Sequence, residues 1–129
     1  MSIVTGLSRP SQQFGPSHRL LSASDYRLVF QNTERKAGQK ELLLLARRST
    51  LTHHRLGLAI AKKHVPTAVK RNLIKRLARE CFRRLDPSAP ALDIVVLSRP
   101  GARAASRADL RGALATQFGR LGLTPETTG

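Results

Sequence analysis

The segment AVKRNLIKRLARECFRRL, residues 68–85, constrains the fold more than any other stretch, because it is strongly basic and yet has the spacing of a core helix. Each helical residue turns the chain by about 100°, and Thr67, after Pro66, is a candidate N-cap. On such a helix the apolar side chains share one flank: Val69, Leu73, Ile74, Leu77, Cys81 and Leu85. The other flank, which we call the cationic ridge, carries Arg71, Asn72, Lys75, Arg76, Arg79 and Arg83. We therefore expect a helix that is buried on one flank and charged on the other.

The charge of this region exceeds what a solvated helix face requires. Residues 62–84 hold nine Lys or Arg and a single acid, Glu80. Solvated faces usually mix signs, because opposite charges at i,i+4 stabilise a helix, whereas Arg71, Lys75 and Arg79 repeat like charges at that spacing. A solvated face is the commoner explanation of a charged run, but this excess favours a surface that binds a polyanion.

The whole chain shares this bias. Its 129 residues include 23 Lys or Arg and 8 Asp or Glu, which gives a formal net charge of +15. Such a chain repels itself until an acidic partner neutralises it. Nucleic acid is the expected partner, because no apolar run approaches the roughly 20 residues that span a bilayer. The N-terminal residues lack the charged start and long apolar core of a secretory signal, so a cytoplasmic protein is expected.

Three segments have the pattern of strands. ELLLLARR is a short apolar run of the buried type, and DIVVLS, residues 93–98, is another. In RLGLAIAKK, residues 55–63, Leu and Ile alternate with Gly and Ala, so this strand has one bulky face and one smooth face that a helix can approach closely. The last two strands flank the basic helix, which predicts a βαβ unit over residues 55–98.

Two capping boxes mark the beginnings of two further helices. Ser22 with Asp25 opens a helix that runs to about Asn32, and Ser106 with Asp109 opens the last helix. One face of that last helix is apolar, with Leu110, Ala113, Leu114, Phe118 and Leu121. The polar segment TERKAGQK is expected to be a turn. The predicted order is helix, strand, strand, helix, strand, helix, which is an α+β fold.

The chain length fits one domain with a single core. Residues 18–121 are expected to form that domain, between flexible tails at 1–17 and 122–129, which mix Gly, Pro and polar residues without a period. Cys81 is the lone cysteine and cannot form an internal disulfide, so it is expected to act as a small buried apolar residue. No homo-oligomer is predicted.

Two parts of the chain resemble one family. LGLAIAKKHVPTAVKRNLIKRLARECFR, followed by DIVVLSRPG, resembles the protein component of bacterial ribonuclease P, and SHRLLSASDYRLVFQNTERKAG resembles that family's opening helix. The resemblance covers roughly residues 17–120. It implies a small α+β domain that binds a large catalytic RNA, in a holoenzyme that removes 5′ leaders from precursor tRNA with Mg²⁺ held mainly by the RNA. It also implies a left-handed crossover in the βαβ unit, against the usual preference.

The resemblance also implies which residues bind RNA. Arg71 and Asn72 match the first two positions of the family's Arg-Asn-Arg motif, whereas Leu73 departs from the third. The rest of the ridge is implied to face the catalytic RNA with them: Lys75, Arg76, Arg79 and Arg83. Lys62 and Lys63 match the family's double Lys at the strand end, near the catalytic RNA and the precursor.

Tyr26 and Phe30 match the aromatic pair that lines the family's cleft for the single-stranded leader. From the residues alone, two aromatics four apart on one helix are more often core than a platform for bases. The resemblance favours the platform, since stacking on aromatic rings tolerates leaders of any sequence.

The chain has no pattern for protein-based cleavage of RNA. A metal-dependent nuclease needs clustered carboxylates, and the acids here are scattered singly, at residues 25, 34, 41, 80, 86, 93, 109 and 126. His53, His54 and His64 have no Cys or His partner at zinc-site spacing. No catalytic residue and no metal site is therefore predicted in the protein.

Two other classes of protein stay open. A ribosomal or other structural RNA-binding protein would share the charge and the amphipathic helix. A DNA-binding helix fits less well, because the basic helix lies inside a βαβ unit and has no helix-turn-helix partner before it.

Overall fold

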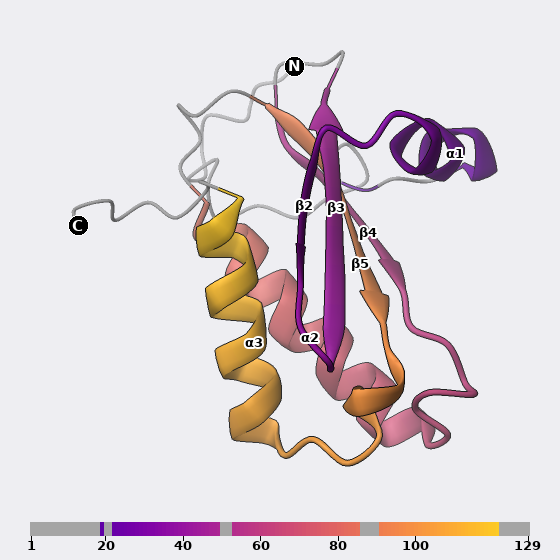
Figure 1. The fold of residues 1–129 in the computed structure, drawn as a ribbon, viewed down its shortest axis with the longest axis vertical. Coiled ribbons are helices and arrows are strands. Elements are labelled where there is room, and N and C mark those ends of the chain that lie inside the picture. The colour runs from indigo at the N-terminus through magenta and orange to yellow at the C-terminus, as the bar shows by residue number, and fades with distance from the viewer. Residues whose placement is uncertain (1–18, 20–21, 50–52, 86–90, 122–129) are drawn as a thin grey trace, which may run out of the picture.

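The computed structural model describes residues 19, 22–49, 53–85 and 91–121. Three helices and four strands follow one another as α1 (Ala23–Gln31), β2 (Arg35–Gly38), β3 (Leu42–Arg48), β4 (Arg55–Ala59), α2 (Ala68–Arg83), β5 (Leu92–Ser98) and α3 (Arg107–Arg120), with a short 3₁₀ turn, η3 (Pro100–Ala102), before α3. The strands form one sheet in the order β2-β3-β5-β4 (Figure 1). The predicted α+β class is confirmed. The predicted tails lie outside the described residues.

The βαβ unit is confirmed by the strand pairing. β4 runs parallel to β5, with Leu56 opposite Ile94, and α2 connects the two strands. The other pairs, β2 with β3 and β3 with β5, are antiparallel. The left-handed crossover stays a prediction.

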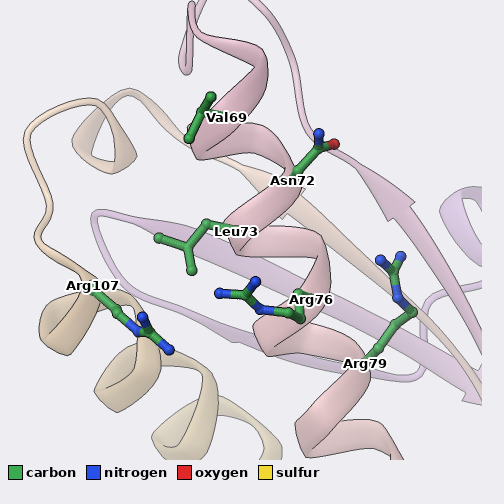
Figure 2. A pocket seen from close by; sticks show the side chains of 6 residues that line it. All are labelled: Val69, Asn72, Leu73, Arg76, Arg79 and Arg107. Atoms are coloured by element: carbon green, nitrogen blue, oxygen red, sulfur yellow. The ribbon is translucent and has the colours of Figure 1, made fainter.

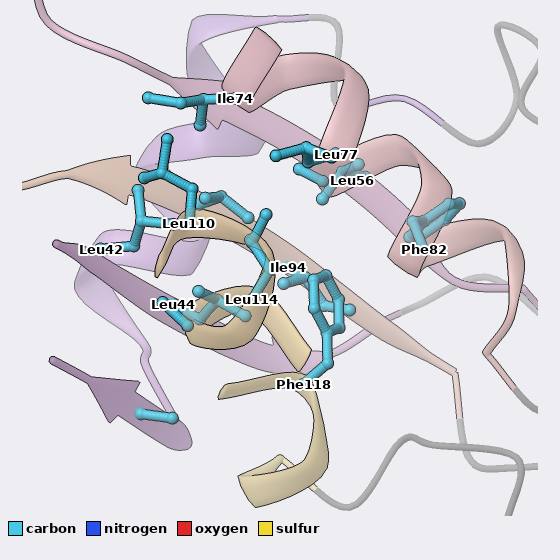
Figure 3. Packing of buried hydrophobic residues seen from close by; sticks show 14 of the residues in the cluster. Leu42, Leu44, Leu56, Ile74, Leu77, Phe82, Ile94, Leu110, Leu114 and Phe118 are labelled. Atoms are coloured by element: carbon cyan, nitrogen blue, oxygen red, sulfur yellow. The ribbon is translucent and has the colours of Figure 1, made fainter. Parts of the chain in front are cut away.

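Helices cover both faces of the sheet, with α2 and α3 on one face and α1 on the other (Figure 1). The main core lies between the sheet and the α2–α3 pair (Figure 3). Its labelled side chains are Leu42, Leu44, Leu56, Ile74, Leu77, Phe82, Ile94, Leu110, Leu114 and Phe118. A smaller cluster of Val29 and Val95 lies under α1. The sheet is therefore fully packed on one face and only partly covered on the other.

The three helices begin at the predicted caps. The hydroxyl of Ser22 accepts from the amide of Asp25 at 3.1 Å, and that of Ser106 accepts from the amide of Asp109 at 3.0 Å. Both capping boxes are complete. Thr67 accepts from the amide of Lys70 at 3.3 Å. Hydrogen bonds from the Ser106 backbone and side chain lower the pKa of Asp109, as expected for a carboxylate held at a helix N-terminus.

Two details differ from the sequence prediction. The segment expected to be only a turn contains strand β2, which pairs with β3 from Arg35 to Gly38. The residues of β2 are mostly polar, as is common in a short edge strand. No alternation of apolar and polar residues therefore marked this segment as a strand. The strand predicted over residues 55–63 ends earlier, at Ala59.

One buried ion pair ties three elements together. Arg55 donates to both carboxylate oxygens of Asp93, at 2.9 and 2.7 Å, and its guanidinium lies 3.6 Å from Asp25. These residues belong to β4, β5 and α1. The hydrogen bond to Asp93 raises the pKa of Arg55 against the opposing effect of burial. The pair therefore joins the two parallel strands and holds α1 close to them.

Gly101 provides the sharpest test of the packing around η3. A Cβ atom built at Gly101 would lie 2.4 Å from the carbonyl oxygen of Lys40, whereas one at Gly112 meets nothing within 4 Å. Because backbone atoms cannot move aside cheaply, Gly101→Ala is expected to lower the free energy of unfolding by about 1–3 kcal/mol. Gly112→Ala, in α3, is expected to raise it by about 0.4–1 kcal/mol.

Urea denaturation of both variants beside the wild type measures this contrast. A Gly101→Ala protein as stable as Gly112→Ala would show that the close approach of η3 to Lys40 is wrong.

Candidate RNA-binding surface

α2 is attached to the fold by one flank only. Ile74, Leu77, Ala78 and Phe82 are buried against the sheet and α3, and Leu73 and Cys81 are partly buried beside them. The prediction that Val69 belongs to the buried flank is wrong, since Val69 is 82% exposed. The buried flank of α2 instead includes Ala78 and Phe82, which lie further round the helix.

The cationic ridge lies on the opposite flank. Asn72 and Arg76 are exposed, and Lys75, Arg79 and Arg83 are half-buried. Burial lowers the pKa of Arg79, and the charges of Arg83 and then Arg19 lower it further. No ion pair within the described segments involves the ridge, which is therefore positively charged there, as a site for polyanions requires.

Arg71 has a structural task as well as a place on the ridge. Its guanidinium donates to the carbonyl oxygens of Val65 and Pro66, at 3.0 and 2.9 Å. These bonds fix the loop between β4 and α2 to the helix. Substituting Arg71 would therefore disturb the loop, so loss of RNA binding in such a variant would not by itself show a contact with RNA.

Lys62 and Lys63 lie on that same loop and are exposed. The hydroxyl of Ser98, at the end of β5, accepts from the amide of Ala61 at 2.8 Å and lies 3.1 Å from Nδ1 of His64. The loop is thus held at both of its ends. The structure places the double Lys next to the beginning of the ridge, on a fixed segment.

Tyr26 and Phe30 lie side by side on α1, with ring centroids 6.5 Å apart. Their environments differ. The Tyr26 hydroxyl accepts from the amide of Leu58 at 3.1 Å, and its ring occupies the space over Gly57, where a Cβ atom would approach it to 2.8 Å. Phe30 is 45% exposed. The smooth face of β4 therefore admits α1, and Phe30 is the aromatic of the pair that is more open to a ligand.

Two cations that lie near the ridge were not predicted from the sequence. Arg19 pairs with β4 at Leu56 and adds its charge to that around Arg79. Arg107, at the start of α3, lines a groove together with Asn72 and Arg76 of α2 (Figure 2). Both residues stand far from the ridge in the sequence, and only the tertiary packing brings them to it.

The carboxylates of the described residues do not form a metal site. No group of three His, Cys, Asp or Glu side chains comes together in the part of the chain that the structure describes. Asp25 and Asp93 both lie against the guanidinium of Arg55. Cys81 is partly buried, and burial raises the pKa of its thiol, which disfavours the reactive thiolate.

The fold and this surface define a small, basic α+β protein built to bind nucleic acid. The family model for ribonuclease P matches residues 14–122. The ribonuclease P protein component of Saccharophagus degradans is 44% identical over 98 residues, which cover 76% of this chain and 73% of that protein. The ribonuclease P protein component of Aliivibrio fischeri is 43% identical over 108 residues, covering 84% and 92%.

A solved structure agrees in fold. The RNase P protein of Staphylococcus aureus superposes with a TM-score of 0.72 at 22% sequence identity, over 83% of this chain and 97% of that one. The chain belongs to the family of ribonuclease P protein components. This assignment decides against the ribosomal and DNA-binding alternatives. Within the described segments, no helix is long and apolar enough to cross a membrane.

Proposed function

We propose that this chain, the RNA-binding protein subunit of ribonuclease P, binds the catalytic RNA through α2 and holds the 5′ leader of precursor tRNA beneath α1. Binding of the catalytic RNA by α2 is supported by the way this helix is attached to the core. Its buried flank is anchored in the core, and its ridge presents Asn72, Arg76 and their basic neighbours to solvent. A rigid helix with this charge positions an RNA backbone without needing to read its sequence.

The RNA partner performs the chemistry in this proposal. Asp25 and Asp93 are engaged with Arg55, and the described residues hold no group of three His, Cys, Asp or Glu side chains that could bind Mg²⁺. Mg²⁺ would then be bound by RNA phosphates, where it can stabilise the charge that develops during cleavage. The protein contributes by lowering repulsion between the phosphates of the two RNAs and by orienting the precursor. We propose a cytoplasmic site of action, where precursor tRNA is made.

The leader-binding part of the proposal rests on the uneven cover of the sheet. α1 packs over Val95 and Gly57, and the partly buried Leu45 and Leu97 lie at the margin of this small cluster. Phe30 is 45% exposed and lies beside Tyr26, whose ring packs against this cluster. An exposed aromatic ring is suited to stacking an unpaired base, at about 1–3 kcal/mol per base.

Reconstitution tests the proposed function directly. Precursor tRNA and Mg²⁺ are incubated with the protein alone, with the ribonuclease P RNA alone and with both, at near-physiological salt. We expect no cleavage by the protein alone and faster cleavage by the RNA when the protein is added. Cleavage by the protein alone would refute catalysis by the RNA, and an RNA rate that the protein leaves unchanged would refute the proposed assistance.

The ridge is tested by the salt dependence of RNA binding. Lys75→Ala should weaken binding to the catalytic RNA and reduce the slope of log K against log [salt] by about 0.7–0.9, as expected for one lost phosphate contact. Arg120→Ala removes the same charge at the exposed far end of α3 and serves as the control. Equal slopes for Lys75→Ala and the wild type would show that the ridge is merely solvated.

The leader cleft is tested with a matched pair on α1. Phe30 and Leu28 are exposed to similar extents, 45% and 43%. Phe30→Ala should weaken binding of leader-bearing precursor by about 1–3 kcal/mol, while leaving mature tRNA unaffected, because only the precursor has a base to stack. Leu28→Ala should leave both affinities unchanged. Equal losses for precursor and mature tRNA would contradict a role of Phe30 in leader binding.

A further inference from the structure

A groove of about 590 Å³ lies between α2 and the start of α3. It is lined by Val69, Asn72, Leu73, Arg76, Arg79 and Arg107. Figure 2 shows Leu73 and Arg76 directed from α2 toward α3, and Arg107 directed back toward them. The volume lies within the roughly 300–1,000 Å³ typical of small-ligand sites, so the groove has room for one nucleotide unit of a larger chain.

The chemistry of the groove is divided between apolar and cationic surface. Val69 is 82% exposed, which is unusual for a large aliphatic side chain, and Leu73 beside it is partly buried. Arg76 and Arg107 are exposed and come from different helices. The ion pairs found in the described segments both belong to Arg55, so neither groove arginine is neutralised there by a carboxylate. An occupant must therefore bring negative charge and an apolar face together.

We infer that this groove seats an unpaired nucleotide of the RNA partner. Its base would lie against Val69 and Leu73, and its phosphates would accept hydrogen bonds from Arg76 and Arg107. Unpaired nucleotides expose a flat apolar face together with phosphate oxygens, and guanidinium groups both stack on bases and bind phosphates. A regular duplex would offer this groove phosphates but no base face.

Two observations favour RNA over an acidic peptide as the occupant. The groove is continuous with the cationic ridge, since Asn72, Arg76 and Arg79 belong to both. The chain also carries a net charge of +15, so the whole surface around the groove attracts a long polyanion more strongly than a short one. The inference rests on the proposed function and adds α3 to the RNA-binding surface through Arg107.

Val69→Asp tests the apolar side of the groove. Val69 is the second residue of α2, whose first turn contains no acid, so Asp at this position should keep the helix intact or stabilise it. We expect Val69→Asp to weaken binding to the catalytic RNA at least about tenfold, because a carboxylate would face the phosphates at close range. Ala108→Asp is the matched control: Ala108 is exposed, is the second residue of α3, gains the same charge, and does not line the groove.

Arg107→Ala tests the cationic side. It should weaken RNA binding about tenfold, as for the loss of a hydrogen bond to a charged group. Arg111→Ala removes the same charge one turn later on α3, outside the groove, and should change the affinity much less. Filter binding of the full-length proteins to the ribonuclease P RNA at 0.15 M salt, with melting temperatures measured in parallel, gives both comparisons.

The outcomes separate this inference from the proposed function. If each groove variant and its control weaken binding alike, or if neither groove variant weakens it, the nucleotide seat is refuted; a lower salt slope for Lys75→Ala would then still support the proposed function. If the groove binds an acidic peptide and not RNA, neither groove variant would weaken binding to the RNA. If the wild-type protein neither binds the RNA nor assists it, the proposed function itself fails. If Val69→Asp does not fold, the contrast between Arg107→Ala and Arg111→Ala decides alone.

Discussion

The attachment of α2 by a single flank is the constraint on which the rest of the molecule depends. Ile74, Leu77, Ala78 and Phe82 hold the helix in the core, which leaves its other flank free to concentrate charge. Crowded cations destabilise a helix by themselves, since like charges at i,i+4 repel each other. The burial of the apolar flank offsets that repulsion. The fold thus stabilises a charge pattern that an isolated helix would resist, and the same arrangement makes the surface ready for RNA.

Four of the chain's acids act away from the ridge, and this preserves the positive surface. Asp93 and Asp25 share Arg55 beneath α1, and Asp109 serves as part of a helix cap. The exposed carboxylate oxygen of Glu34 accepts the amide of Arg48 on β3. These carboxylates therefore hold strands and helix ends in place without neutralising the ridge. Because each of these acids lies away from the outer flank of α2, the carboxylates that stabilise the fold leave the ridge positively charged.

The features that were predicted correctly from the sequence depend on interactions between residues close together in the chain. The three caps at Ser22, Thr67 and Ser106 follow from hydrogen bonds within one turn, and the βαβ unit follows from hydrophobic period on either side of one helix. Strand β2 was missed because its polar residues become a strand only by pairing with β3. Val69 was misplaced because a helical wheel gives bearings but not the positions of the neighbouring elements, which leave Val69 82% exposed and bury Ala78 and Phe82. For the same reason no sequence pattern could assign Arg107 to the surface of α2.

The position of Leu73 shows how packing and charge are balanced on this surface. The resemblance to the family leads one to expect Arg there, but Leu73 packs against the core and faces α3. An arginine at this point would replace the apolar contact that Leu73 makes with the core by a charged guanidinium. Arg107 approaches the same space from the opposite helix and brings a guanidinium without withdrawing an apolar side chain from the core. The charge absent from α2 at position 73 is thus present in the groove from α3, so the positive surface is a property of two helices whose spacing is fixed by their shared core.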